Sequence, residues 1–511
     1  MNLEETLPQI IDKDIFFYYN LDNIDDQINS NHIKNIITNI VFIGFDDNIG
    51  SISEKIYPNN SLDKETLQII SQIGFPETNI ISEEGQINYI FNYRINFNKY
   101  PLNNVNIKTQ KFNYCYTKFI QIKDIKIKRG GFSQKSIIII SNNYSPNIYL
   151  PLLDNIYDLY LKNNYIPLND KTIENFLKNN NFEIKTSEIK NNHNNNNNNN
   201  EYINLRDSLI TEPFPIIKIN NFFENFSFYY INKIFSLWEL VITEIPIMVF
   251  SDSPTICSNI VKLLESLIYP LKYYGDIRPY FSVYDQDFKY YREESHLVKT
   301  NIPIIGCINP IHLKYFPDFY ILHFDDNYFN ENGYNENPTK HLTYLTYDLI
   351  EKNKYSFYIK PKKEGNNKFK NLKLLLRTDR NLIKSFYDFV NENKNNEFID
   401  MSRMNIYLRM YLIEMNNDFM RNIQDYLFKY NIEEIQKIGF IKENFSIYEI
   451  FDEKKFCDYL NKNKDNNIFN KKYMNNIKKC CELYKKFFKT KIFYHFLEKL
   501  LPKIKHLKKE E

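Results

Sequence analysis

The chain of 511 residues contains no alanine, only 11 glycines and a single tryptophan. Its six cysteines form no Cys-x-x-Cys pair, which argues against a structural zinc site or a disulfide framework and favours a reducing compartment. No run of 18 apolar residues occurs, and the first residues are acidic where a signal peptide would be basic. We therefore expect a soluble, intracellular protein.

Sequence motifs for common kinds of covalent chemistry are also missing. The glycines form neither GxxxxGK[ST] nor GxGxxG, no GxSxG elbow occurs, and none of the eight histidines lies in an HExxH pattern. Asp285 and Asp287 are interpreted as ordinary turn acids. We therefore predict no catalytic residue, no metal site and no cofactor. A formal net charge of +2 gives no general attraction to nucleic acid, so no nucleic-acid partner is expected.

The length predicts two to four domains, at roughly 100–200 residues per domain. Residues 36–181 mix strand-like and helical segments and are typical of an α+β domain. Residues 182–206 contain a run of asparagines, are too polar to form a core, and are predicted to be a disordered linker. The expected strands of the first domain cover 39–46, 51–57, 87–95, 112–123 and 136–141, and its helices cover 62–73, with Ser61 as N-cap, 149–163 and 172–180.

Residues 207–340 are expected to form a core α/β domain with a largely parallel sheet, because short apolar strands alternate with helices. A helix is predicted over 254–268, with Ser253 as its cap and Pro254 in the first turn, where the missing N–H costs nothing. Trp238 is interpreted as a core anchor, because its large area dominates local packing. The strands of this domain are expected at 246–250, 278–283, 302–308 and 319–324.

Residues 341–511 are predicted to be helical, and one apolar stripe with helical spacing is interpreted as core. The segment 471–511 holds 13 lysines against four glutamates, a net charge of +9. This excess is either a solvated face or a surface for anionic lipid or an acidic partner, since a lysine near an anionic membrane contributes about 1 kcal/mol. The stripe consists of Met401, Met404, Leu408, Leu412, Met415, Phe419 and Ile423.

The segment 270–288 admits two interpretations. Arg278 with Tyr280 and Phe281 places a charged fork beside an exposed aromatic ring, the kind of anchor that protein interfaces use. Alternatively, Asp276 and Arg278 form a structural ion pair beneath a buried tyrosine and phenylalanine.

Two long strings of residues resemble DENN-domain proteins of the class-six (Avl9-related) group. The first is Trp238-Glu239-Leu240, Pro246, Ser253-Pro254, Pro270-Leu271-Lys272-Tyr273, Asp276, Arg278-Pro279-Tyr280-Phe281, Gly306 and Asn309-Pro310. The second is Val41-Phe42-Ile43-Gly44-Phe45-Asp46, Ile56-Tyr57-Pro58, Phe75-Pro76, Lys128-Arg129-Gly130, Phe132 and Gln134-Lys135-Ser136. The resemblance covers most of the chain and thins beyond residue 430.

The resemblance implies an α/β fold arranged as a tripartite DENN module. Its parts are an N-terminal longin-like domain (36–181), the central α/β sheet domain (207–340) and a helical downstream region (341–511). It implies a guanine-nucleotide exchange factor that promotes GDP release from a Rab-family small GTPase in endosomal recycling and vesicle traffic. The alternative is a DENN-fold adaptor that binds a Rab or a membrane without exchange activity.

Such a factor performs no covalent chemistry of its own. The expected location is cytoplasmic, and the resemblance leaves open recruitment to endosomes and peripheral membrane contact through the basic C-terminal segment. Arg278→Ala is expected to lower exchange with little change in melting temperature. The candidate Rab-binding residues are Asp276, Arg278, Tyr280, Phe281, Lys128, Arg129 and Lys135.

Overall fold

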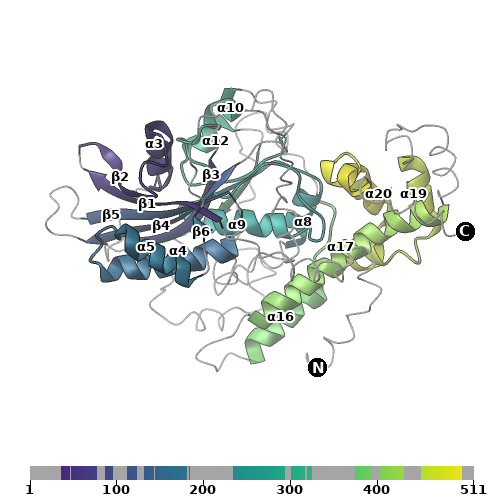
Figure 1. The fold of residues 1–511 in the computed structure, drawn as a ribbon. Helices are drawn as coiled ribbons and strands as arrows, with labels where there is room; N and C mark the ends of the chain where they lie inside the picture. Colours follow the sequence, from purple (N-terminus) through teal and green to yellow (C-terminus); the bar gives the residue numbers. More distant parts are fainter. Residues whose placement is uncertain are drawn as a thin grey trace, which may run out of the picture.

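The structure is a computed structural model, and its ribbon is drawn in Figure 1. The structure describes residues 36–46, 48–77, 87–95, 112–123, 132–142, 144, 146–180, 183–184, 234–293, 301–316, 319–324, 374–392, 402–430 and 451–497.

The N-terminal part is built on an antiparallel sheet with the strand order β2-β1-β5-β4-β3. Its segments are rich in β-branched and aromatic residues, which pack well on a pleated surface. A short strand β6 pairs in parallel with β1, so the predicted linker begins with two residues that belong to the sheet. The strands are β1 (Ile36–Asp46), β2 (Gly50–Tyr57), β3 (Ile87–Ile95), β4 (Asn113–Lys123), β5 (Phe132–Ser141) and β6 (Glu183–Ile184).

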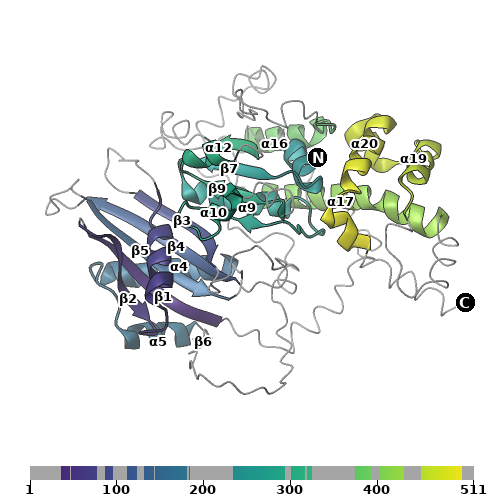
Figure 2. The same ribbon diagram turned by 90° about the horizontal axis from the view of Figure 1, so that it is seen from above.

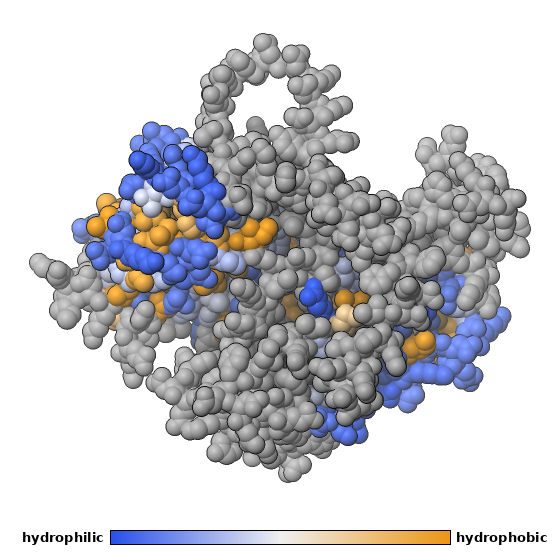
Figure 3. All heavy atoms as spheres, turned by 60° about the horizontal axis from the view of Figure 1, so that its bottom comes forward, coloured by the Kyte–Doolittle hydropathy of each residue, from blue (hydrophilic) through white to orange (hydrophobic). Residues whose placement is uncertain are grey.

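Helices cover both faces of this sheet (Figure 1): α3 (Lys64–Ile73) lies on one face, and α4 (Pro146–Lys162) with α5 (Asp170–Asn179) lies on the other. Alternate residues of β1 serve the two faces, since Val41 belongs to one apolar cluster and Phe42 to the other. Figure 3 views the molecule from the side of α4 and α5, where hydrophobic residues show between hydrophilic ones.

The predicted cap of the first helix is corrected by the structure. Asp63 caps α3, because its carboxylate accepts a hydrogen bond from the Thr66 N–H at 2.9 Å. The Ser61 hydroxyl instead donates to the Pro58 carbonyl at 2.6 Å.

The second part contains a parallel sheet with the order β10-β7-β9-β8, as the alternation of strands and helices predicts. Ser253 caps α9 with Pro254 in its first turn, also as predicted. The strand expected at 278–283 is shorter, because β8 pairs only at Ile277 and Arg278. The elements are α8 (Ile234–Ile242), β7 (Ile247–Ser251), α9 (Pro254–Ser266), β8 (Ile277–Arg278), α10 (Phe288–Glu293), β9 (Ile304–Cys307), α12 (Ile311–Tyr315) and β10 (Tyr320–Phe324).

The third part is helical, and Figure 2 shows the parallel sheet between it and the antiparallel sheet. The apolar stripe from Leu408 to Ile423 is buried, as predicted, while the side chains of Met401 and Met404 lie outside the described residues. The elements are α16 (Arg380–Glu392), α17 (Ser402–Tyr430), α19 (Glu453–Lys462), the π-helix η7 (Asn470–Met474) and α20 (Ile477–Phe487).

A mixed α/β fold with an antiparallel sheet and a helical C-terminal region is thus confirmed, while the tripartite boundaries stay a prediction. Residues 185–206, where the asparagine run lies, are outside the described residues. Within the described part of the chain, no helix is long and apolar enough to cross a membrane.

Candidate functional site

The two sheets meet at a joint where charged side chains are buried. Arg278 stands on β8, is 2% exposed, and its Nε lies 3.0 Å from Oδ2 of Asp276. Its Nη1 donates to both carboxylate oxygens of Asp285 at 3.2 Å, and its Nη2 pairs with Asp287. Arg94 reaches the same Asp276 from strand β3 of the other sheet. Two guanidinium groups and three carboxylates therefore meet at this boundary, and the Arg94–Asp276 pair crosses it.

The ionisation of this charge cluster follows from burial and pairing. Burial is the largest influence on Asp276 and raises its pKa, but Arg278 and Arg94 outweigh it, so the pKa lies below its usual value. Burial raises the pKa of Asp285 more than the charge of Arg278 lowers it. The negative charge of Asp287 raises it further, and the pKa reaches about 6. The Tyr291 hydroxyl donates to Asp276 at 2.6 Å, which further satisfies that carboxylate.

A second connection runs through Glu77, which follows α3. One oxygen of its carboxylate accepts a hydrogen bond from the Val283 N–H at 2.9 Å and another from the Ser282 hydroxyl. The other oxygen accepts from the Asn309 amide at 2.6 Å. One acidic side chain of the antiparallel-sheet part thus holds two loops of the parallel-sheet part.

Exposed apolar side chains lie close to the groups that Glu77 holds. Tyr284 is 46% exposed and Ile311 is 38% exposed, and each lies within two residues of a Glu77 contact. From the other sheet, Phe45 is 49% exposed, and its ring lies 5.9 Å from that of Phe75, two residues before Glu77. We call Phe45, Phe75, Tyr284 and Ile311 the apolar rim of the joint. Phe75 is half-buried and the other three are exposed. Exposed apolar residues contributed by two parts of a chain are found at protein-binding surfaces.

The structure buries the candidate string Asp276–Phe281. Asp276, Arg278, Tyr280 and Phe281 are each at most 2% exposed, which matches the interpretation as a structural pair beneath buried aromatic residues. Their contact with a partner stays a prediction, and in this conformation they present no side chain to the surface.

Of the basic candidates, the structure describes Lys135. Lys135 is on β5 and pairs with Glu54 of β2, while Lys128 and Arg129 lie outside the described residues. In the described part of the chain, no group of three or more His, Cys, Asp or Glu side chains is arranged to hold a metal ion.

Two of the three carboxylates that bind Arg278 were not predicted as its partners. Asp285 and Asp287 were interpreted as ordinary turn acids, but they are 7% and 6% exposed and bind the guanidinium group. The available signal was the closeness of two acids to an arginine between apolar residues. Arg94 and Glu77 gave no such signal, because each meets its partners from more than 180 positions away in the chain.

Comparison with known proteins agrees with the resemblance found in the sequence. A family model described as the DENN (AEX-3) domain matches residues 132–283, which run from β5 of one sheet to the joint. The chain is 25% identical over 314 residues to Protein DENND6 homolog of Dictyostelium discoideum, covering 52% of this chain and 42% of that protein.

Two vertebrate proteins give similar matches. Identity to Protein DENND6A is 27% over 310 residues for Gallus gallus, covering 54% of this chain and 51% of that protein. Identity to Protein DENND6A of Mus musculus is 26% over 309 residues, covering 54% of this chain and 49% of that protein. The matches span about half the length of these curated relatives. The resemblance to class-six DENN proteins is thereby confirmed.

Proposed function

We propose, from this confirmed resemblance to class-six DENN-domain proteins, that the chain is a guanine-nucleotide exchange factor for a Rab-family small GTPase. The observation that carries the proposal is the match of residues 132–283 to the DENN domain model, which includes Asp276, Arg278 and the Ser282 and Val283 contacts of Glu77. By the same resemblance, we assign the activity to endosomal recycling traffic.

Exchange requires no group on this chain to form a covalent bond. A factor that binds the nucleotide-free state of its GTPase more tightly than the GDP-bound state accelerates GDP release. A thousandfold acceleration requires about 4 kcal/mol of differential binding. A surface that is rigid before binding supplies this more readily, because less free energy is lost in ordering it.

We infer that the apolar rim of the joint contacts the GTPase. Its members come from both sheets, so their spacing depends on the ion pairs and the Glu77 bonds that fix one sheet against the other. In this proposal Arg278 and Asp276 are positioning residues, as are Tyr280 and Phe281 beneath the rim. Lys128 and Arg129, which precede β5 in the sequence, and Lys135 on β5 remain candidates for direct contact.

The test is release of fluorescent GDP from a panel of purified Rab proteins, with and without the full chain. Acceleration on at least one Rab is the expected result. Binding to a nucleotide-free Rab without faster release would replace the proposal with the adaptor function. If neither binding nor release occurred on any well-folded Rab, the proposed function would be wrong.

The apolar rim is tested by Ile311→Asp, with Ile166→Asp as the matched control. Both isoleucines are exposed, at 38% and 61%, so neither change should unfold the chain. Ile166 lies between α4 and α5, away from the joint. We expect Ile311→Asp to slow exchange at least tenfold and Ile166→Asp to leave it unchanged. Equal exchange rates for the two variants would place the contact surface elsewhere.

A further inference from the structure

The two edges of the antiparallel sheet differ in how their backbone groups are satisfied. At the β3 edge, helix α9 supplies hydroxyl acceptors: the Ile90 N–H donates to Thr255 Oγ1 at 2.9 Å, and the Asn92 N–H donates to Ser258 Oγ at 3.2 Å. An edge strand presents N–H and C=O groups outward. Here hydroxyl groups of the neighbouring part accept hydrogen bonds from two of these N–H groups. The β3 edge is therefore closed to another strand.

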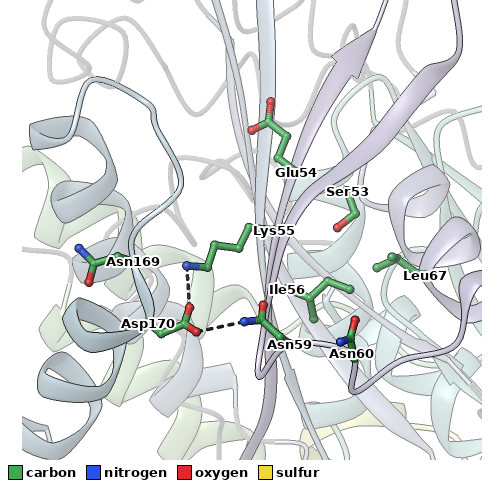
Figure 4. A pocket seen from close by; sticks show the side chains of 9 residues that line it. All are labelled: Ser53, Glu54, Lys55, Ile56, Asn59, Asn60, Leu67, Asn169 and Asp170. Carbon is green, nitrogen blue, oxygen red and sulfur yellow. Dashed lines mark hydrogen bonds and ion pairs between the residues drawn. The ribbon is translucent and has the colours of Figure 1, made fainter.

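At the opposite edge, β2 borders an open hollow of about 560 Å³. Among the described strands, β2 pairs only with β1. Figure 4 shows the hollow beside four consecutive residues of β2, with α3 and the start of α5 on either side. The lining consists of Ser53, Glu54, Lys55, Ile56, Asn59, Asn60, Leu67, Asn169 and Asp170.

The charges in the hollow are already paired. Lys55 Nζ lies 2.6 Å from Asp170 Oδ1, and the Asn59 amide donates to the other oxygen of Asp170 at 3.1 Å (Figure 4). Glu54 pairs with Lys135. The remaining lining is uncharged and consists of Ser53, Ile56, Leu67 and the asparagines 59, 60 and 169. Such a lining complements a ligand of low net charge that brings its own donors and acceptors.

A bulge limits the length of any added strand. Phe42 pairs with Lys55 and Ile43 pairs with Ser53, so Glu54 is an extra residue in β2. A bulge twists an edge strand and interrupts regular pairing beyond it. The edge therefore suits a short extended segment better than the long strand of a second copy of this chain.

We propose that the hollow beside β2 binds a short extended peptide of low net charge from a partner protein, which adds to the sheet as a further strand. Backbone hydrogen bonds provide affinity in this kind of recognition, and side-chain pockets provide specificity. The site lies on the edge away from the β3–α9 contact, and Glu54 in its lining pairs with Lys135, one of the candidates for GTPase contact.

A library of random twelve-residue peptides, selected on the full chain, tests the proposal. We expect selected peptides to bind the wild-type chain and to lose at least tenfold in affinity on Asn59→Trp, which fills the hollow from an exposed position. Asn155→Trp, at an exposed position of α4 outside the hollow, is the matched control and should bind as the wild type does. No selected peptide, or equal binding to both variants, would overturn the proposal.

Backbone chemistry separates strand addition from other modes of binding. Two N-methylated forms of a selected peptide are compared, one methylated at the odd-numbered residues and one at the even-numbered residues. One form should lose binding, because its N–H groups would face β2, and the other should bind unchanged. Unchanged binding of both forms would mean that the hollow holds side chains, and strand addition would be excluded. If sedimentation shows a dimer of the full chain that Asn59→Trp dissociates, the occupant is a second copy, and the partner peptide is wrong.

Discussion

The parallel-sheet part holds its two neighbours by different chemistry. Toward the antiparallel sheet, the contact depends on ion pairs such as Arg94 with Asp276. Toward the C-terminal helices, the Trp238 ring meets Phe419 edge to face, with ring centroids 5.3 Å apart, and its Nε1–H donates to Asn416 at 2.7 Å. Charge-assisted hydrogen bonds are directional, whereas apolar contact is not. The first contact thus suits a surface whose two halves must keep their spacing.

Carboxylates occur at both contacts but with different partners. On the C-terminal side, Glu239 accepts hydrogen bonds from the N–H groups of Leu375 and Leu376 at 2.7 and 3.1 Å. Glu244 accepts from those of Lys491 and Ile492 at 2.8 and 3.1 Å. For both glutamates, burial raises the pKa more than these bonds lower it. The Arg–Asp joint therefore concentrates opposite charges, while at the C-terminal contact each carboxylate accepts two backbone N–H bonds, and Glu239 also lies 3.8 Å from Lys486 Nζ.

The largest change in unfolding free energy is expected for Arg278→Ala. The substitution leaves Asp276, Asp285 and Asp287 buried without their common partner, and breaking a buried ion pair in this way costs about 3–5 kcal/mol. Because Arg278 is buried, we now expect Arg278→Ala to lower the melting temperature, whereas the sequence alone predicted little change. Urea denaturation of the wild type and the variant measures the difference. A loss below about 1 kcal/mol would show that the charge cluster does not hold the joint.

The next effect is a pH dependence carried by Asp285. Its folded pKa of about 6 is raised above its unfolded value, so between about pH 4 and 6 the folded state binds more protons, and this group destabilises the fold as the pH rises. Asparagine does not titrate. The stability of the wild type minus that of Asp285→Asn should therefore fall by roughly 2–3 kcal/mol from pH 4 to pH 7. A difference that is constant or rises with pH would contradict the assignment.

On the other side, Trp238→Phe should cost about 1–2 kcal/mol. The phenyl ring keeps most of the packing against Phe419 but leaves the buried Asn416 Oδ1 without the indole donor. The Asn416 amide still donates to the carbonyls of Leu267 and Tyr269, so the connection persists. Thermal unfolding measures the change, and a loss as large as that of Arg278→Ala would remove the contrast between the two contacts.

The local parts of this fold were predictable from the sequence, whereas the partners across the joint were not. The strand expected over 39–46 and the Ser253 cap of α9 are set by neighbours in the chain, and the structure confirms both. The cap of α3 was misplaced by two residues because Ser61 and Asp63 are both good caps, and only the geometry of the preceding turn decides between them.

For the candidate site, the sequence identified the string around Arg278 and left two interpretations open, one exposed and one buried. The choice between them depends on distant residues, because Arg94 and Glu77 meet this segment only after the sheets have packed. The apolar rim was equally invisible, because Phe45 and Ile311 are far apart in the sequence.

The smallest effect on stability is expected for substitutions of exposed lysines in the C-terminal helical part. Lys478, Lys485 and Lys489 are exposed, while Leu483, Tyr484 and Phe487 of the same segment are buried. Removing the segment from residue 471 onward would therefore destroy core packing, so changing the three lysines to glutamine is the sharper test of lipid contact. We expect the free energy of unfolding of this triple variant to differ from that of the wild type by less than about 0.5 kcal/mol.

Flotation with vesicles rich in phosphatidylserine should fall for this triple variant, because each lysine near such a surface contributes about 1 kcal/mol. Changing the exposed lysines 454, 462 and 464 to glutamine is the matched control, since it removes equal charge from α19 and the turn after it. Equal flotation of both variants and the wild type would identify the lysines as a solvated face. The C-terminal contact would then serve only to complete the core.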